Sequence, residues 1–123
     1  MQKELFRIES VNSENDGNFR AVARMHAEHE IFKGHFPELP VLPGVCLLYL
    51  IRICAEKHLK QQLHYVVVEA CKFSSIVDPL RTEELRLHVE TKPHAKGIKI
   101  KAVVHYGPRL VLKTQAIVRS IPA

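Results

Sequence analysis

The sequence lacks long apolar runs and shows no secretory leader. No stretch approaches the roughly 20 residues that a membrane-spanning helix needs. The longest apolar run, residues 41–51, is interrupted near its start by Pro43 and Gly44. The first ten residues, MQKELFRIES, carry charges but not the apolar segment of a signal peptide. We therefore expect a cytoplasmic protein with no membrane partner.

Cysteine is scarce, and its spacing fits neither a disulfide framework nor a zinc site. The three cysteines, Cys46, Cys54 and Cys71, are an odd number and contain no C-x-x-C pair. We interpret them as buried free thiols of a reducing compartment. Cys46 stands at the start of a predicted helix, where a thiol pKa can be lowered, but no paired base is evident. The histidines show no metal-ligand spacing, so we expect neither a metal nor a cofactor.

Positive charge is in excess, with a formal net charge of +5 and a pI near 9.3. The lysines and arginines are scattered, mostly on the polar side of alternating segments. They form either a solvated face or a surface that attracts an acidic partner. Zinc-finger spacing, arginine-rich runs and aromatic RNA-binding motifs are missing, so we expect no nucleic-acid partner.

The 123 residues, 46% of them apolar, are expected to form one domain, residues 1–123. Residues 5–11 alternate weakly and residues 19–26 alternate clearly between apolar and polar side chains. An Asn-Asp-Gly-Asn turn at 15–18 separates them, which predicts a hairpin.

A proline-rich segment then precedes the one strongly helical pattern. Pro37, Pro40 and Pro43 indicate that residues 29–43 form neither a helix nor a central strand. A helix is predicted from Pro43 to Leu59. Its first turns would carry apolar side chains on nearly every side, which is typical of a buried helix. Pro43 suits the first helical turn, where its missing N–H costs little.

Four more strands are predicted after the helix, at 65–73, 85–90, 98–105 and 110–119. Short connections favour an antiparallel meander. We therefore predict an α+β fold in which an antiparallel sheet of about six strands wraps one long central helix.

Two segments carry a family resemblance. GHFPELPVLPGV, at 34–45, resembles the active-site signature of hot-dog-fold 3-hydroxyacyl-[acyl-carrier-protein] dehydratases of the FabZ and FabA type. CKFSSIVDPLRTEEL, at 71–85, is similar to the strand-loop-strand after that family's central helix, and the order of elements fits nearly the whole chain. The preceding HEIFK is most similar to the ApeI-like dehydratases of pigment clusters.

The resemblance implies roles for the motif residues. His35 matches the catalytic base that removes a proton next to the thioester carbonyl, and Gly44 matches the residue whose N–H binds the thioester oxygen. Phe36, Pro43 and Val45 would contact substrate. The resemblance also implies a homodimer, or a heterodimer with a related subunit, with sites at the interface and the acyl chain on phosphopantetheine of an acyl carrier protein. Both chemical roles are plausible, because histidine titrates near neutral pH and a helix start presents free N–H groups.

One expected residue is replaced. Fourteen residues after His35, where the family has Glu or Asp, stands Tyr49, and the family's glutamine a turn later falls at Ile53. A phenol with a pKa near 10 stays protonated at neutral pH. Tyr49 can therefore donate a hydrogen bond, or simply fill the space of the lost carboxylate, but it is no anionic base.

Other acidic residues were weighed as substitutes for the lost carboxylate. Glu30 and Glu38 flank the histidine in the loop, and either is a candidate. Glu56 lies two turns after Tyr49, about 10 Å along the helix, where we expect it to pair with Arg52. His29 is interpreted as a surface loop residue or a second polar group near the pocket.

Three functions follow as hypotheses. The first is a dehydratase-like hydro-lyase that acts on a carrier-bound 3-hydroxyacyl thioester, with His35, Gly44 and Tyr49 in its site. The second is a catalytically degenerate subunit that binds acyl chains or carrier protein, or pairs with an active dehydratase. The third, thioester hydrolysis, is weakened by the loss of the carboxylate that such enzymes generally use.

Overall fold

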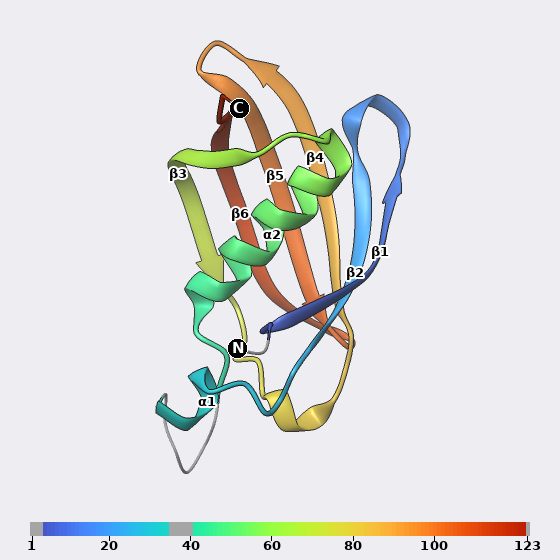
Figure 1. The fold of residues 1–123 in the computed structure, drawn as a ribbon, viewed down its shortest axis with the longest axis vertical. Helices are drawn as coiled ribbons and strands as arrows, with labels where there is room; N and C mark the ends of the chain where they lie inside the picture. Colours follow the sequence, from blue (N-terminus) through green and yellow to red (C-terminus); the bar gives the residue numbers. More distant parts are fainter. Residues whose placement is uncertain (1–3, 35–40, 123) are drawn as a thin grey trace.

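The computed structural model describes residues 4–34 and 41–122 and shows a curled antiparallel sheet around one long helix (Figure 1). The strands are β1 Phe6–Ser13, β2 Phe19–Met25, β3 Leu63–Phe73, β4 Leu85–His94, β5 Gly97–Tyr106 and β6 Arg109–Ser120. The helices are α1 Ile31–Gly34 and α2 Gly44–Leu59, and short 3₁₀ turns occupy Asn15–Gly17 (η1) and Pro79–Arg81 (η2). The predicted α+β class, the first hairpin and the central helix are confirmed.

The six strands are arranged in the order β1-β2-β4-β5-β6-β3. β1 and β2 form the predicted hairpin, and β4, β5 and β6 form an antiparallel meander. The predicted meander is wrong for β3, which pairs with β6 and not with β4. The connection from Phe73 to Leu85 is long enough to carry the chain from one side of the sheet to another. β1 and β3 therefore form the two edges of the sheet.

The concave face of the sheet holds α2. Six helix residues are buried against it: Cys46, Leu47, Leu50, Ile51, Cys54 and Ala55. The strands supply alternating apolar side chains from the other side, as in β4, where Leu85, Leu87 and Val89 are buried. The intervening residues face solvent, among them Lys101 and Lys113. The basic side chains thus occupy solvent-facing positions on the outer face of the sheet.

Two details of the proline-rich region differ from expectation. The chain forms the one-turn helix α1 at 31–34, although the segment 29–43 was predicted to contain no helix. Proline restricts its own position and the residue before it, and α1 ends before Pro37. Pro43 is the residue before α2 and not part of its first turn, because its backbone is extended, with φ −61° and ψ 137°.

The position of α2 is fixed by polar contacts at β3. The Tyr65 hydroxyl donates to the Leu48 carbonyl oxygen at 2.6 Å, and burial raises the pKa of this phenol. The Glu56 carboxylate accepts from the Leu63 N–H at 2.8 Å. These contacts hold the start of β3 and the helix in one relative position, which matters because the helix start belongs to the candidate site.

Candidate active site

Gly44 is the first residue of α2, and its N–H lies at the positive end of the helix dipole. The residue before it, Pro43, has no side chain that could cap the helix. Among the described residues, none accepts a hydrogen bond from the Gly44 N–H. A free N–H at a helix start is suited to bind a carbonyl oxygen that gains negative charge.

The aromatic ring of Phe73, the last residue of β3, lies directly against Gly44. A Cβ atom added at Gly44 would lie 2.5 Å from Cε1 of this ring and 2.6 Å from Cζ. Only glycine fits here without a shift of the ring. Phe73 is itself 50% exposed, so one face of the ring contacts the helix start while the rest is open to a ligand or another chain.

We expect Gly44→Ala to displace the Phe73 ring. The added methyl group should lower the free energy of unfolding by about 1 kcal/mol and should reduce any turnover that uses the Gly44 N–H, because the ring shifts beside it. Urea unfolding and an acyl-thioester assay measure both effects. Combining Gly44→Ala with Phe73→Leu should recover part of the stability, since the shorter side chain leaves room. An equal loss in the double variant would contradict this account.

Of the other predicted site residues at or before the helix start, the structure describes Pro43 and Val45 only. His35 and Phe36 lie outside the described residues. Val45, in the first turn of α2, is 68% exposed, and Pro43 is half-buried. Val45 is therefore available for contact with another molecule.

Tyr49 packs on the opposite side of the helix from Phe73. Its ring stacks on Phe6 of β1, with centroids 6.5 Å apart, and the Arg52 guanidinium carbon lies 5.3 Å from the ring centre. The side chain remains 48% exposed. Tyr49 is thus held from two sides and lines a pocket without closing it.

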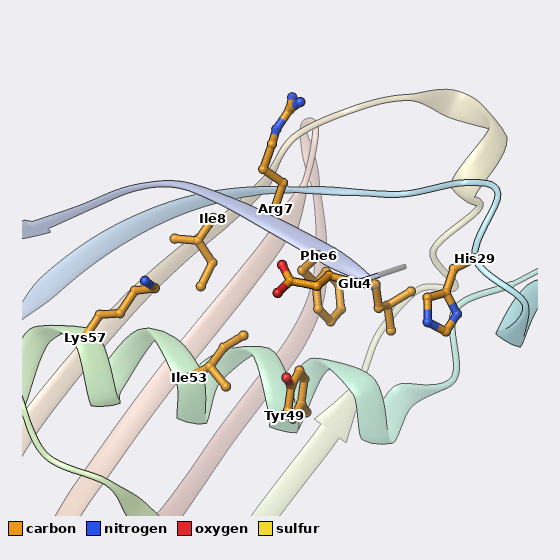
Figure 2. A pocket seen from close by; sticks show the side chains of 9 residues that line it. Glu4, Phe6, Arg7, Ile8, His29, Tyr49, Ile53 and Lys57 are labelled. Atoms are coloured by element: carbon orange, nitrogen blue, oxygen red, sulfur yellow. The ribbon is translucent and has the colours of Figure 1, made fainter. Parts of the chain in front are cut away.

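The pocket beside Tyr49 has a volume of about 630 Å³ and lies between β1 and α2 (Figure 2). Ile8 and Ile53 form facing apolar walls, with Lys57 at one end and His29 at the other. The complete lining is Glu4, Leu5, Phe6, Arg7, Ile8, His29, Tyr49, Ile53 and Lys57. Arg7 points away from the pocket, and the Glu4 carboxylate lies over it, on the wall facing Tyr49 (Figure 2).

His29 is held by the backbone of α1. Its Nδ1 accepts the Ile31 N–H at 3.0 Å. An Nδ1 that accepts carries no proton, so the neutral ring has its proton on Nε2. His29 therefore belongs to the pocket that contains Tyr49 and presents a hydrogen-bond donor.

Of the acidic candidates from the sequence, the two that the structure describes, Glu30 and Glu56, do not line this pocket. Glu56 pairs with Arg52 at 3.1 Å, as expected, and also accepts the Leu63 N–H. Glu30 is exposed and is not part of the lining, and Glu38 lies outside the described residues. Among the described residues, the carboxylate that faces Tyr49 is that of Glu4. No sequence signal marked this residue, because it precedes an edge strand 45 positions before Tyr49 and outside any motif.

Gly44 and Tyr49 face different edges of the sheet. Gly44 contacts Phe73 of β3, whereas Tyr49 contacts Phe6 of β1. On an ideal helix, five residues correspond to about 140° of rotation and about 7.5 Å of rise. The motif's helix start and its replaced carboxylate position are therefore presented on two separate sides of α2.

The cysteines take no part in this arrangement. Burial raises the pKa of the Cys46 thiol, despite its place near the helix start, and raises that of Cys54 to about 12. Both are buried, as predicted, and their thiols stay protonated at neutral pH. The prediction was wrong for Cys71, which is exposed because it lies on the edge strand β3.

Metal-binding clusters and membrane-spanning helices are both absent from the described residues. Among residues 4–34 and 41–122, no three His, Cys, Asp or Glu side chains are grouped to hold a metal ion. In the same part of the chain, no helix has the length and apolar character to cross a membrane.

A dehydratase family model matches residues 10–107. It is the ApeI-like model, described as ApeI dehydratase. The chain belongs to the ApeI-like dehydratase family. The match covers the hairpin, α2 and the strands through β5, which confirms the resemblance drawn from the motif.

Curated relatives of this ApeI-like chain are FabZ dehydratases. A 3-hydroxyacyl-[acyl-carrier-protein] dehydratase FabZ from Janthinobacterium sp. (strain Marseille) is 26% identical over 116 residues, covering 85% of this chain and 73% of the relative. The FabZ of Geobacillus sp. (strain WCH70) is 33% identical over 103 residues, covering 76% and 69%.

Solved structures share the fold of this ApeI-like chain. The dehydratase heterocomplex ApeI:P from Xenorhabdus doucetiae aligns with a TM-score of 0.74 at 16% identity, covering 92% of this chain and 96% of that one. An uncharacterized protein from Erwinia carotovora subsp. atroseptica aligns with a TM-score of 0.70 at 20% identity, covering 94% of each chain. The predicted hot-dog fold is confirmed.

Proposed function

We propose that this ApeI-like protein eliminates water from a 3-hydroxyacyl thioester carried by an acyl carrier protein. The observation that carries the proposal is the free N–H of Gly44 at the start of α2, within a chain of a dehydratase family. The thioester oxygen accepts this N–H and gains negative charge as the reaction proceeds. One such donor contributes about 3–4 kcal/mol of transition-state stabilisation in acyl-transfer enzymes.

His35 acts as the base in this proposal. The imidazole takes a proton from C2 of the acyl chain, and the electron pair left on C2 forms the double bond to C3. The C3–O bond breaks, and the leaving hydroxyl takes up the proton now held by the His35 imidazolium and departs as water, which returns the imidazole to its neutral form. A histidine with an ordinary pKa near 6.5 is suited to accept that proton at neutral pH.

Tyr49 serves as a hydrogen-bond donor to the leaving hydroxyl. Its ring is fixed between Phe6 and Arg52, so the phenol has a defined position at the pocket. Since the protonated phenol cannot accept a proton as an anion would, Tyr49 binds and polarises the hydroxyl and does not act as a base.

The protein works as a dimer built through the edge strand β3. β3 pairs only with β6, which leaves its other edge free, and its side chains Val66, Val67 and Val68 are each more than a third exposed. Phe73, Val45 and Ile76 add exposed apolar surface near the helix start. An exposed apolar edge strand is a favoured site of strand addition. A second copy, or a related subunit, would cover it and bring one chain's helix start to the other chain's Tyr49.

A second candidate function is a degenerate subunit that binds acyl chains and stabilises an active partner. The replacement of the family's carboxylate by Tyr49 favours it. The structurally similar ApeI:P is a dehydratase heterocomplex, which is consistent with such a pairing. This candidate shares the fold, the pocket and the dimer surface with the first, and differs in lacking turnover of its own.

The direct test is a turnover assay of the purified protein with 3-hydroxyoctanoyl thioester on carrier protein. We expect the enoyl product, detected by absorbance and mass spectrometry, without release of free thiol. No product with the protein alone, but product after addition of a carboxylate-bearing hot-dog subunit that co-purifies with it, would favour the degenerate subunit. Free thiol would instead indicate hydrolysis.

Tyr49→Glu separates the two candidates further. If the protein is already a dehydratase, replacing the phenol donor should change turnover by less than about tenfold, because a carboxylic acid at the same position can also assist the leaving hydroxyl. If it is a degenerate subunit, the new carboxylate should create turnover where there was none. Tyr49→Phe is the matched control, since it keeps the ring packing on Phe6 and removes only the hydroxyl.

A further inference from the structure

We propose that Glu4 and Tyr49 together recognise the hydroxyl group of the substrate, so that the pocket between β1 and α2 selects hydroxyacyl chains over keto and saturated chains. The inference rests on the proposed function, because it assigns specificity within the same site. It adds Glu4, a residue outside the family motif, as a positioning residue.

The two groups come from facing walls of the pocket. Glu4 precedes β1, and Tyr49 lies on α2, with the pocket of about 630 Å³ between the elements. Figure 2 shows the Glu4 carboxylate over the pocket and the Tyr49 hydroxyl on the helix below it. Stacking on Phe6 limits the movement of the Tyr49 ring.

The pair is chemically complementary to an alcohol. A hydroxyl group donates one hydrogen bond and accepts others, whereas a carboxylate only accepts and a protonated phenol can donate. Glu4 can therefore accept the hydroxyl proton while Tyr49 donates to the hydroxyl oxygen. A ketone can use only the Tyr49 donor, and a methylene can use neither group.

The described charges around the pocket leave the Glu4 carboxylate available. Arg7, three residues after Glu4, pairs with Glu9 at 3.2 Å and points away from the pocket, while Lys3 lies outside the described residues. Lys57 lies at the far end, two helical turns from Tyr49, which is about 12 Å along the axis. Among the described residues, none forms an ion pair with Glu4.

The rest of the lining suits the hydrocarbon part of such a ligand. Ile8 and Ile53 face each other between the polar pair and Lys57. An acyl chain placed there buries its methylene groups against these side chains, and removing that apolar surface from water favours binding. Chain binding and hydroxyl recognition therefore come from different residues and can be separated by substitution.

The test is binding of three thioesters of N-acetylcysteamine that differ only at C3: 3-hydroxyoctanoyl, 3-oxooctanoyl and octanoyl. Calorimetry on the full-length dimer at 4 °C, with His35→Ala to prevent turnover, gives the affinities. We expect the hydroxy compound to bind about tenfold more tightly than either analogue, since a hydrogen bond to a charged group is stronger than a neutral one. Glu4→Gln and Tyr49→Phe should each remove most of that preference while leaving octanoyl binding within twofold.

The matched control is Glu90→Gln, an exposed carboxylate on the outer face of the sheet, which should keep the full preference. Equal binding of the three thioesters, or an unchanged preference in Glu4→Gln, would overturn the inference even if the wild type eliminates water. Hydroxyl-selective binding without elimination would instead sustain the inference and refute the dehydratase function.

Discussion

His35→Ala should lower the rate of elimination by at least 100-fold, with substrate affinity changed little. General-base catalysis contributes about 10²–10⁴ in rate, and alanine at position 35 removes the proposed base. The variant should still bind the hydroxyacyl thioester, because binding uses the pocket beside Tyr49. Steady-state and single-turnover assays separate the loss in kcat from any change in affinity.

The control for this prediction is His105→Ala, a half-buried histidine of β5 on the far side of the sheet. It should retain wild-type turnover. Near-normal activity of His35→Ala would contradict the assignment of the base. In that event His29, which lies in the pocket with Tyr49, becomes the next residue to substitute.

Val67→Asp should convert the proposed dimer to a monomer at micromolar concentration and abolish turnover with it. Val67 lies in the middle of the edge strand β3 and is 39% exposed in the single chain. Burying a carboxylate there without a partner, and opposing it to its own copy, costs several kcal/mol. We expect the dimer Kd to rise about 100-fold or more, measured by analytical ultracentrifugation.

Val103→Asp provides the matched control for the dimer prediction. It makes the same change on β5, an interior strand whose side chain at this position is half-buried on the outer face. It should leave both the dimer and the turnover intact. A Val67→Asp protein that stays dimeric would place the interface elsewhere, and a monomer that keeps full activity would show that one chain contains a complete site.

Local patterns predicted most of the elements, but not how β3 joins the sheet. Alternation of apolar residues located β4 as the segment starting at Leu85, and the absence of proline and glycine located α2 up to Leu59. The pairing of β3 with β6 depends on contacts between residues far apart in sequence, from 39 positions for Phe73 with Leu112 to 57 for Leu63 with Ser120. No local signal encodes such a pairing, and the prediction of a simple meander therefore failed.

The candidate site was likewise predicted only where its residues are close in sequence. Gly44 and Tyr49 were found from the motif because they are close in sequence, and the structure adds that they face different sheet edges. Glu4 was not found as a partner of Tyr49, since the chain brings the two together only when β1 packs beside α2. His29 was interpreted as a surface loop residue or a second polar group near the pocket, and the structure supports the second interpretation. Residues that precede an edge strand or a one-turn helix carry no periodicity from which a role can be inferred.

The contact between Phe73 and Gly44 ties the helix start to the last residue of the edge strand. Whatever covers β3 therefore also orders the wall beside the oxygen-binding N–H. Specific activity should then fall on dilution as dimers dissociate by mass action, and added carrier-bound substrate should shift the midpoint of that fall to lower protein concentration. The fraction of dimer and the specific activity would then both depend on the same monomer–dimer equilibrium.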